Sequence, residues 1–157
     1  MLNKMRIGLI ILFFTAVSAS AAPLNNDPIL SKTLLLNQIC LQAEIWGDVE
    51  IVLSPAFADR IIIQGDVNDV DRIETGIKNG RLVVKARQVK QLNKTRIIVP
   101  AALLSFIRVN GKGLITSSGQ LNTPQLKVEL NGEACVKLRS SGSVQVETTR
   151  DYDLSTH

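Results

Sequence analysis

The sequence predicts an all-β fold of the β-solenoid type, a single domain of stacked coils in which each strand-turn unit buries its apolar face against the next. The main observation is a repeat. Residues 107–116 and 128–137, 21 residues apart, each read as an alternating strand, an Asn-Gly break and a second strand. A weaker copy spans 44–51 and a truncated copy spans 141–146. Beyond the N-terminal apolar segment, no stretch shows sustained helical periodicity.

Residues 1–21 are predicted to be a cleaved export signal. Lys4 and Arg6 form a short basic region, residues 7–17 form an apolar core, and residues 19–21 are the small residues that a signal peptidase recognises. The alternative is an uncleaved membrane anchor, but the apolar run is well short of the roughly 20 residues that span a bilayer. We therefore expect an exported bacterial protein, in the periplasm, at the cell surface or secreted, that does not span a membrane after cleavage.

The mature chain suits one β domain, predicted over 34–147 and followed by a polar tail at 148–157. Removing 21 of 157 residues leaves about 136, enough to bury a core without a metal or a disulfide lattice. Alternation and short apolar runs predict the first strands at 34–45, 49–53, 61–63, 73–77 and 81–86. Asn79-Gly80 between the last two is a strong hairpin signal.

The second half continues the strand pattern and contains the two best copies of the repeat. Strands are expected at 95–99, 105–109, 114–116, 125–130, 134–138 and 144–146. Because side chains alternate between the two faces of a strand, Leu126, Val128 and Leu130 should face the same core as Ile107 and Val109, one repeat away.

Glycines mark the predicted turns between strands. A tight corner between stacked strands needs either a positive φ or close backbone approach, which Gly tolerates because it lacks a Cβ. Asn before Gly also tolerates the left-handed region better than most side chains. The glycines expected to be structural in this way are Gly47, Gly80, Gly111, Gly132 and Gly142.

Charge is unevenly distributed along the chain. The sequence has 18 basic and 14 acidic residues, and Lys4 and Arg6 leave with the signal, so the mature net charge is +2. Residues 75–128 contain ten basic residues and no acid, whereas residues 22–74 contain nine acids and three bases. The basic segment indicates either a surface for anionic polymers or basic strands that pair with acidic neighbours across a sheet. The low net charge and scarce aromatics give no case for nucleic acid binding.

Catalytic and metal chemistry find little support in the sequence. The only His is the last residue, His157, so a His-based triad or a His-dependent zinc site has no candidate. The acidic segment 66–71 invites a calcium hypothesis. However, Val70 occupies a ligand position of an EF-hand loop, and the required Gly and distal Glu are misplaced. We interpret this segment as a solvated loop between strands and expect no enzyme activity, no cofactor and no metal.

The two cysteines allow two interpretations. Alternation within 34–45 puts Cys40 on the other face of the strand from Ile39 and Leu41. The same argument in 134–138 turns Cys135 away from the core. Exposed free thiols are uncommon in an oxidising compartment, which favours a Cys40–Cys135 disulfide. The alternative is a pair of packed, unbonded cysteines, because sequence does not show whether the two Cα atoms approach within disulfide range.

Several segments resemble one known family over roughly residues 37–147. The segments that carry the resemblance are Gly47-Asp48-Val49-Glu50-Ile51-Val52-Leu53, Gly65-Asp66-Val67-Asn68, Asn79-Gly80-Arg81-Leu82-Val83-Val84 and Ile107-Arg108-Val109-Asn110-Gly111-Lys112-Gly113. The chain resembles the family described as "putative auto-transporter adhesin, head GIN domain". The resemblance implies an exported β-helix-like domain with a role in adhesion or at the cell envelope. It implies no catalytic or binding residue.

Two functions of different class are therefore expected. The first is an adhesin-like, non-enzymatic binding module that contacts an anionic glycan, lipopolysaccharide or an envelope protein. Arg87, Lys90 and Lys94 are its candidate binding residues, because they lie in or beside a segment of low strand propensity and loops on a rigid scaffold often carry binding residues. The alternative is a structural envelope or spacer protein that acts through protein–protein contacts.

Overall fold

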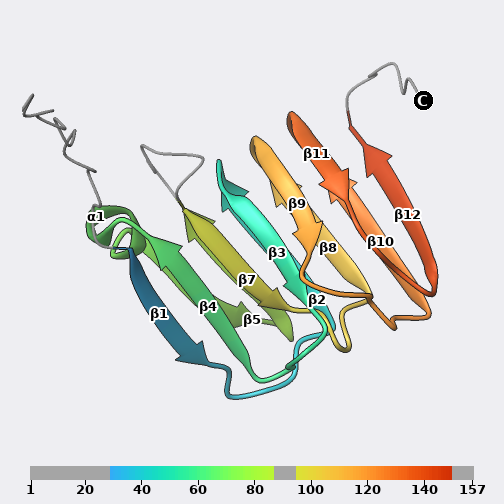
Figure 1. Cartoon of the computed structure of the whole chain (residues 1–157), viewed down its shortest axis with the longest axis horizontal. Helices are drawn as coiled ribbons and strands as arrows, with labels where there is room; N and C mark the ends of the chain where they lie inside the picture. Colours follow the sequence, from blue (N-terminus) through green and yellow to red (C-terminus); the bar gives the residue numbers. More distant parts are fainter. Residues whose placement is uncertain (1–28, 87–94, 150–157) are drawn as a thin grey trace, which may run out of the picture.

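The computed structural model describes residues 29–86 and 95–149 (Figure 1). The expected export signal lies outside these residues, as does the predicted polar tail after Thr149. No helix within the described part of the chain is long and apolar enough to cross a membrane.

The predicted all-β class is confirmed. The described residues form twelve strands and one helix of four residues. In chain order these are β1 (Leu30–Leu35), β2 (Gln42–Gly47), β3 (Glu50–Ser54), β4 (Arg60–Gly65), α1 (Val67–Val70), β5 (Ile73–Lys78), β6 (Arg81–Ala86), β7 (Arg96–Pro100), β8 (Phe106–Asn110), β9 (Gly113–Ser117), β10 (Gln125–Leu130), β11 (Ala134–Lys137) and β12 (Ser143–Thr148).

The strands form two mixed sheets that lie face to face, with β1 at one end of the molecule and β12 at the other (Figure 1). Sheet A has the order β1-β4-β7-β3-β9-β11, and sheet B has the order β12-β10-β8-β2-β6-β5. Neither sheet closes on itself within the described residues. Each sheet therefore has two edges, and those at the C-terminal end are β11 and β12.

In the structure, the sequence repeat appears as parallel pairing between neighbouring levels. A level is one strand of sheet B together with the strand of sheet A that follows it in the chain. β8 lies beside β10 with Ile107 opposite Val128, and β9 lies beside β11 with Ile115 opposite Val136, which is the 21-residue spacing in both sheets. The weaker copy adds a third level, because Ile45 of β2 lies opposite Val109 of β8. The stack does not follow chain order: β2 and β3 lie between β6 and β7 on one side and β8 and β9 on the other.

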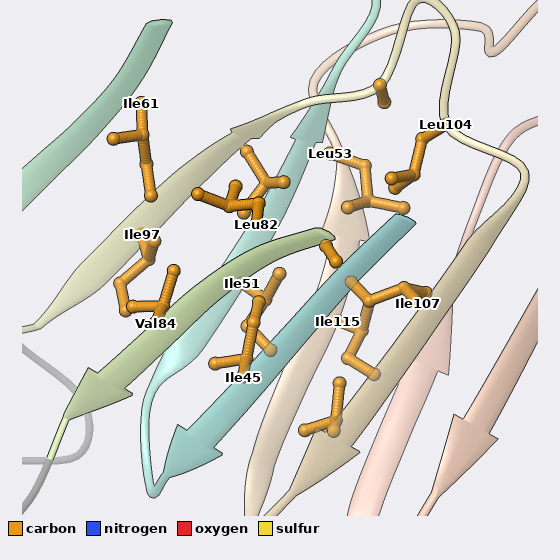
Figure 2. Packing of buried hydrophobic residues seen from close by; sticks show 14 of the residues in the cluster. Ile45, Ile51, Leu53, Ile61, Leu82, Val84, Ile97, Leu104, Ile107 and Ile115 are labelled. Atoms are coloured by element: carbon orange, nitrogen blue, oxygen red, sulfur yellow. The ribbon is translucent and has the colours of Figure 1, made fainter. Parts of the chain in front are cut away.

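One apolar core fills the space between the sheets (Figure 2). Alternation along each strand supplies it, as in β8, where Ile107 is fully buried while Phe106 and Arg108 face outward. The sequence prediction for β10 is confirmed: the inward residues Leu126, Val128 and Leu130 are 1 %, 0 % and 4 % exposed.

The predicted strand 34–45 is wrong in extent and partly wrong in orientation. β1 ends at Leu35, and the chain then crosses from sheet A to sheet B before β2 begins at Gln42. Alternation does not run through such a crossing. Ile39 and Leu41, expected in the core, are therefore 57 % and 54 % exposed, whereas Cys40 between them is 5 % exposed.

The predicted solvated loop at 66–71 is instead a one-turn helix. Asp66 caps it, because its Oδ1 accepts a hydrogen bond from the backbone N–H of Asn68 at 2.9 Å. Val70 is fully buried in the core, and Asp69 is 3 % exposed and accepts a hydrogen bond from the Thr95 hydroxyl at 3.4 Å. Across the part of the chain that the structure describes, no three carboxylate, His or Cys side chains gather as they would around a metal ion.

The predicted glycine turns fall where the chain changes direction. Asn79 and Gly80, with φ of 51° and 74°, make the hairpin between β5 and β6. At the corner after β10, a Cβ on Gly132 would overlap the carbonyl oxygen of Gly111, and a Cβ on Gly111 would overlap that of Gly47. Corners of successive levels thus touch backbone to backbone, which requires glycine on the approaching chain.

Candidate functional site

The outward face of sheet B carries an exposed tryptophan at its centre. β2 directs Ala43 and Ile45 into the core, so Glu44 and Trp46 point to solvent, and Trp46 is 45 % exposed. The adjacent strands β6 and β8 place Lys85 and Asn110 directly opposite Trp46. Neighbouring strands lie about 4.8 Å apart, so the indole, an ammonium and an amide occupy one row of the sheet.

A second aromatic ring lies in another row of the same face. The guanidinium of Arg81 is 5.8 Å from the centre of the Phe106 ring, and that of Arg108 is 5.5 Å from it. These are cation–π distances, and the contacts keep both long side chains close to the sheet. We call this surface the Trp46 face; it consists of Glu44, Trp46, Arg81, Lys85, Phe106, Arg108 and Asn110.

Hydrogen bonds across the strands order the polar part of the Trp46 face. Glu44 accepts from Arg81 Nη1 at 3.3 Å and from Asn110 Nδ2 at 3.5 Å. Asn131, the residue after β10, donates from its Nδ2 atom to Asn110 Oδ1 at 2.7 Å, which extends the network to the next level. The Oδ1 atom of Asn131 is buried and has no hydrogen-bond partner among the described residues.

Most charges on the sheets pair across strands, as one of the two sequence interpretations proposed. Ion pairs between neighbouring strands join Arg81 to Glu44, Arg96 to Glu50, Arg108 to Glu129 and Lys127 to Glu147. The Arg108 pair is bidentate, with distances of 3.0 and 3.1 Å, and the Glu129 carboxylate raises the pKa of the guanidinium above its usual value. Much of the predicted basic surface is therefore neutralised within the sheet.

Lys78 and Lys85 differ from these paired bases, because no ion pair joins either to a described residue. They border a shallow depression of about 150 Å³ at the β5 edge of sheet B. Gly76 lies at this depression, and a Cβ there would meet nothing within 4 Å. Glu74 of β5 lies directly opposite Lys85 and also lines the depression, so Lys85 stands between a carboxylate on one side and Trp46 on the other.

The Trp46 face brings aromatic and polar side chains of β2, β6 and β8 together on one outward surface, beside the shallow depression at β5. An indole offers a rigid apolar surface with a polar N–H, and Arg, Asn and Glu side chains offer oriented donors and acceptors. The sequence held a signal for this site. Trp46 alternates with the core residue Ile45, so its outward direction could have been read, but its neighbours on β6 could not.

The predicted binding residues Arg87, Lys90 and Lys94 lie outside the described residues.

Of the two interpretations of the cysteines, the structure shows the unbonded one: Cys40 and Cys135 are both free. Cys135 comes just after Gly132, at the corner of the stack where β2 ends at Gly47. Cys40 lies before the opposite end of β2, and that strand is about 16 Å long at roughly 3.3 Å per residue. Such a separation is beyond disulfide range. Cys135 is exposed, as predicted, but Cys40 is buried, and burial raises the pKa of its thiol.

The family is established by the sequence as a whole. The family model described as "Putative auto-transporter adhesin, head GIN domain" matches residues 40–154. The chain belongs to this family. The resemblance expected from the sequence is thereby confirmed, and the match contains β2 to β12 with the Trp46 face. The chain has no match among curated proteins.

Solved structures share the fold of this chain. A putative adhesin from Bacteroides fragilis NCTC 9343 matches with a TM-score of 0.62 and 17 % identity, over 77 % of this chain and 58 % of the other. A putative lipid binding protein from Parabacteroides distasonis ATCC 8503 gives 0.52 and 11 %, over 78 % and 61 %. A putative adhesin from Parabacteroides merdae ATCC 43184 gives 0.51 and 18 %, over 78 % and 57 %. The chain thus spans less than two thirds of each of these relatives, and at such identities the likeness concerns the fold.

Proposed function

We propose that the mature protein is an exported, non-enzymatic, adhesin-like module that binds an anionic glycan of the cell envelope or surface across the Trp46 face. The observation that carries the proposal is the placement of Trp46, 45 % exposed in the middle of a sheet, between Lys85 and Asn110. An indole stacks on the C–H face of a sugar ring, an amide hydrogen-bonds sugar hydroxyls, and an ammonium pairs with carboxylate or phosphate.

Arg87, Lys90 and Lys94 extend this surface in the proposal. They follow β6 in the sequence, and in the proposal they add positive charge to the binding surface. Membership of an adhesin family supports a binding role, and export through the signal at residues 1–21 would deliver the protein to the periplasm or the cell surface.

Lipopolysaccharide is the first ligand to test, because it combines sugars with phosphate groups and lipid. The name of one solved relative, a putative lipid binding protein, supports including a lipid-bearing glycan among the candidates. The other candidates are acidic polysaccharides and anionic envelope proteins.

We also propose that the strand pairs β2–β3, β8–β9 and β10–β11 are coils of a short β-solenoid. Their support is the parallel register in both sheets and the glycine corners that stack on one another. In this arrangement the outward faces form long flat ribbons, which suit a polymer better than a small molecule.

The test measures retention of the folded protein on immobilised lipopolysaccharide and on anionic liposomes at low and high salt. Trp46→Ala should weaken binding about fivefold to tenfold, as expected for the loss of one aromatic contact. Changing Arg87, Lys90 and Lys94 together to Ser should weaken binding and reduce its salt dependence, because exposed charges are screened over roughly 10 Å at 0.1 M salt. Val67→Ala is the control, since Val67 is 42 % exposed and lies outside the Trp46 face. Retention that responds to neither set of changes would refute the proposal.

The second candidate is a structural envelope or spacer protein that acts through protein–protein contacts. The observation in its favour is the C-terminal end of the stack, where β11 and β12 are edge strands among the described residues. Unpaired edges accept further strands. This candidate predicts a defined assembly with itself or with another protein that Trp46→Ala leaves intact.

A further inference from the structure

Exposed apolar side chains gather at one end of the molecule, where β1 ends and β2 begins. We call this end the loop end. It consists of residues 35–41, 55–60, 78–81, 101–105, 118–124 and 137–142, all of which the structure describes. Figure 1 shows these connections at the lower ends of the strands. The large apolar side chains exposed there are Leu35, Ile39, Leu41 and Leu103, at 75 %, 57 %, 54 % and 49 %. Such a gathering on the surface marks an interaction site.

Hydrogen bonds hold the segments of the loop end together. The carbonyl oxygen of Leu41 accepts from the backbone N–H of Ser105 at 2.9 Å and from its hydroxyl at 3.1 Å, so the crossing from β1 to β2 lies beside the segment that carries Leu103. Where the crossing begins, the backbone N–H of Leu36 donates to the carbonyl oxygen of Asp59 at 2.8 Å. The apolar side chains therefore project from one ordered layer, in which part of the backbone is already hydrogen-bonded.

The loop end is also basic. Its one acid, Asp59, is paired with Arg60 at 2.8 Å. Its other charged residues are all bases: Lys78, Arg81, Lys137 and Arg139. Arg81 is paired with Glu44, but no ion pair joins Lys78, Lys137 or Arg139 to a described residue, and these three are exposed. Free positive charge therefore accompanies the apolar side chains.

We propose that the loop end docks on the surface of an anionic lipid bilayer. Its exposed apolar side chains enter the headgroup layer, and its free bases contact the lipid phosphates. Burial of apolar area and attraction to anionic lipid add together at a membrane surface. Hydrogen bonds within the layer lower the cost of this approach, because a backbone group that leaves water without a partner is unfavourable.

Charge and strand geometry argue against a second copy of the chain as the occupant. Two loop ends that face each other would bring like charges together. The loop end also presents connections between strands, so it offers no row of backbone groups to which a further strand could pair. A bilayer suits both features, since its phosphates complement the bases and its fluid surface accepts side chains from several segments.

Docking in this way leaves the Trp46 row in water. Trp46 is four residues beyond Gln42, which begins β2 at the loop end, so the two lie about 13 Å apart at roughly 3.3 Å per residue. Apolar groups of a peripheral protein enter the membrane surface by only about 5–10 Å. The sheets would stand upright on the bilayer, with Trp46, Lys85 and Asn110 free to bind a glycan above it.

The test measures how much of the mature protein sediments with vesicles of phosphatidylcholine that contain phosphatidylglycerol. Leu35→Ser should weaken this binding about fivefold, and adding Ile39→Ser should weaken it further, because each removes apolar surface from the headgroup layer. Ile29→Ser is the matched control. Ile29 is 76 % exposed and precedes the opposite end of β1, where Leu30 pairs with Gly65, so its change should leave binding unaltered. Equal effects of Leu35→Ser and Ile29→Ser would overturn the proposal.

The contribution of charge is tested at Lys137 and Arg139, which lie outside the Trp46 face. Changing both to Ser should weaken binding to the anionic vesicles about fivefold and make it less sensitive to salt, because exposed charges are screened over roughly 10 Å at 0.1 M salt. On vesicles of phosphatidylcholine alone, the native protein and this variant should bind equally weakly. Native protein that binds both kinds of vesicle equally well would contradict the proposal.

The remaining outcomes separate membrane docking from self-association and from glycan binding. A native protein that ignores vesicles, and that Leu35→Ser converts from a dimer to a monomer, would overturn the proposal and assign the loop end to a second copy. A lipid-free acidic polysaccharide tests the Trp46 face alone: Trp46→Ala should weaken retention on it, whereas Leu35→Ser should not. Loss of vesicle binding in Leu35→Ser does not depend on that result, so each proposal can fail without the other.

Discussion

The middle and the C-terminal end of the stack carry the same strand pattern but differ in burial. In the middle, Ile51 of β3 and Ile115 of β9 are 1 % and 0 % exposed. At the end, Val136 of β11 is only partly buried, and Val146 of β12 is 43 % exposed. All four residues point inward on their strands. The difference is that β3 and β9 have a strand on each side, whereas β11 and β12 each have a neighbour on one side only among the described residues.

The direction of a side chain and its burial therefore have different causes. Alternation decides which way a side chain points, but neighbours on both sides and in the facing sheet decide whether water reaches it. The two regions should therefore respond differently to the same kind of substitution. They should become more alike if a strand covers the open end.

The largest effect is expected in the middle, at Val128. Val128→Asp places a charge at a fully buried position of β10 and should destabilise the protein by about 3 kcal/mol or more. Lys127→Asp, one residue earlier, only breaks the half-exposed ion pair with Glu147 at 2.7 Å and should cost about 1 kcal/mol or less. Thermal unfolding followed by circular dichroism measures both. Equal losses would mean that the register of β10 is wrong.

A smaller difference is expected between two valines of sheet A. Val99→Ala, at a fully buried position of β7, should cost about 2 kcal/mol, whereas Val136→Ala in β11 should cost about 1 kcal/mol. Denaturant unfolding of the two variants gives these energies, and equal losses would contradict the difference between the middle and the end of the stack.

The smallest effect is expected from chemical labelling of the native protein, which compares the reactivity of its two thiols. Cys135 at the open end is exposed and should react with a thiol reagent at once, while Cys40 should react only on unfolding. Burial raises the pKa of Cys40, so less thiolate is present at a given pH, and thiolate is the reactive form. Counting reacted thiols before and after denaturation checks this. Two fast thiols in the folded state would show that the crossing at residues 36–41 is open.

Most strands were predictable where both ends of a segment stay within one sheet, although β1 begins at Leu30, ahead of the first predicted strand. Residues 81–86 and 125–130 alternate from end to end, and the structure places β6 and β10 at those bounds. Prediction failed at 34–45, because apolar residues continue through a crossing between the sheets. Burial there depends on the path of the chain: Cys40 is enclosed while Ile39 and Leu41 are not.

The candidate site was only half predictable. The weak repeat at 44–51 indicated that β2 resembles β8, so Asn110 could have been placed beside Trp46. Lys85 could not, because no repeat links β6 to β2, and their pairing depends on the whole order of sheet B. The sequence indicated that basic residues such as Arg108 could pair with acidic residues on neighbouring strands. Which acid pairs with which base could be known only from the register of the strands in the structure.

The order of the stack also has a consequence for the speed of folding. β2 and β3 come early in the chain, yet they occupy the middle of both sheets. Ala43 pairs with Leu82 and with Ile107, which lie 39 and 64 residues further along the chain. The centre of the core therefore closes only after long loops have been ordered, and a protein rich in such distant contacts crosses a high entropic barrier. During synthesis, the first strands to emerge would wait with their apolar faces open until β8 and β9 arrive.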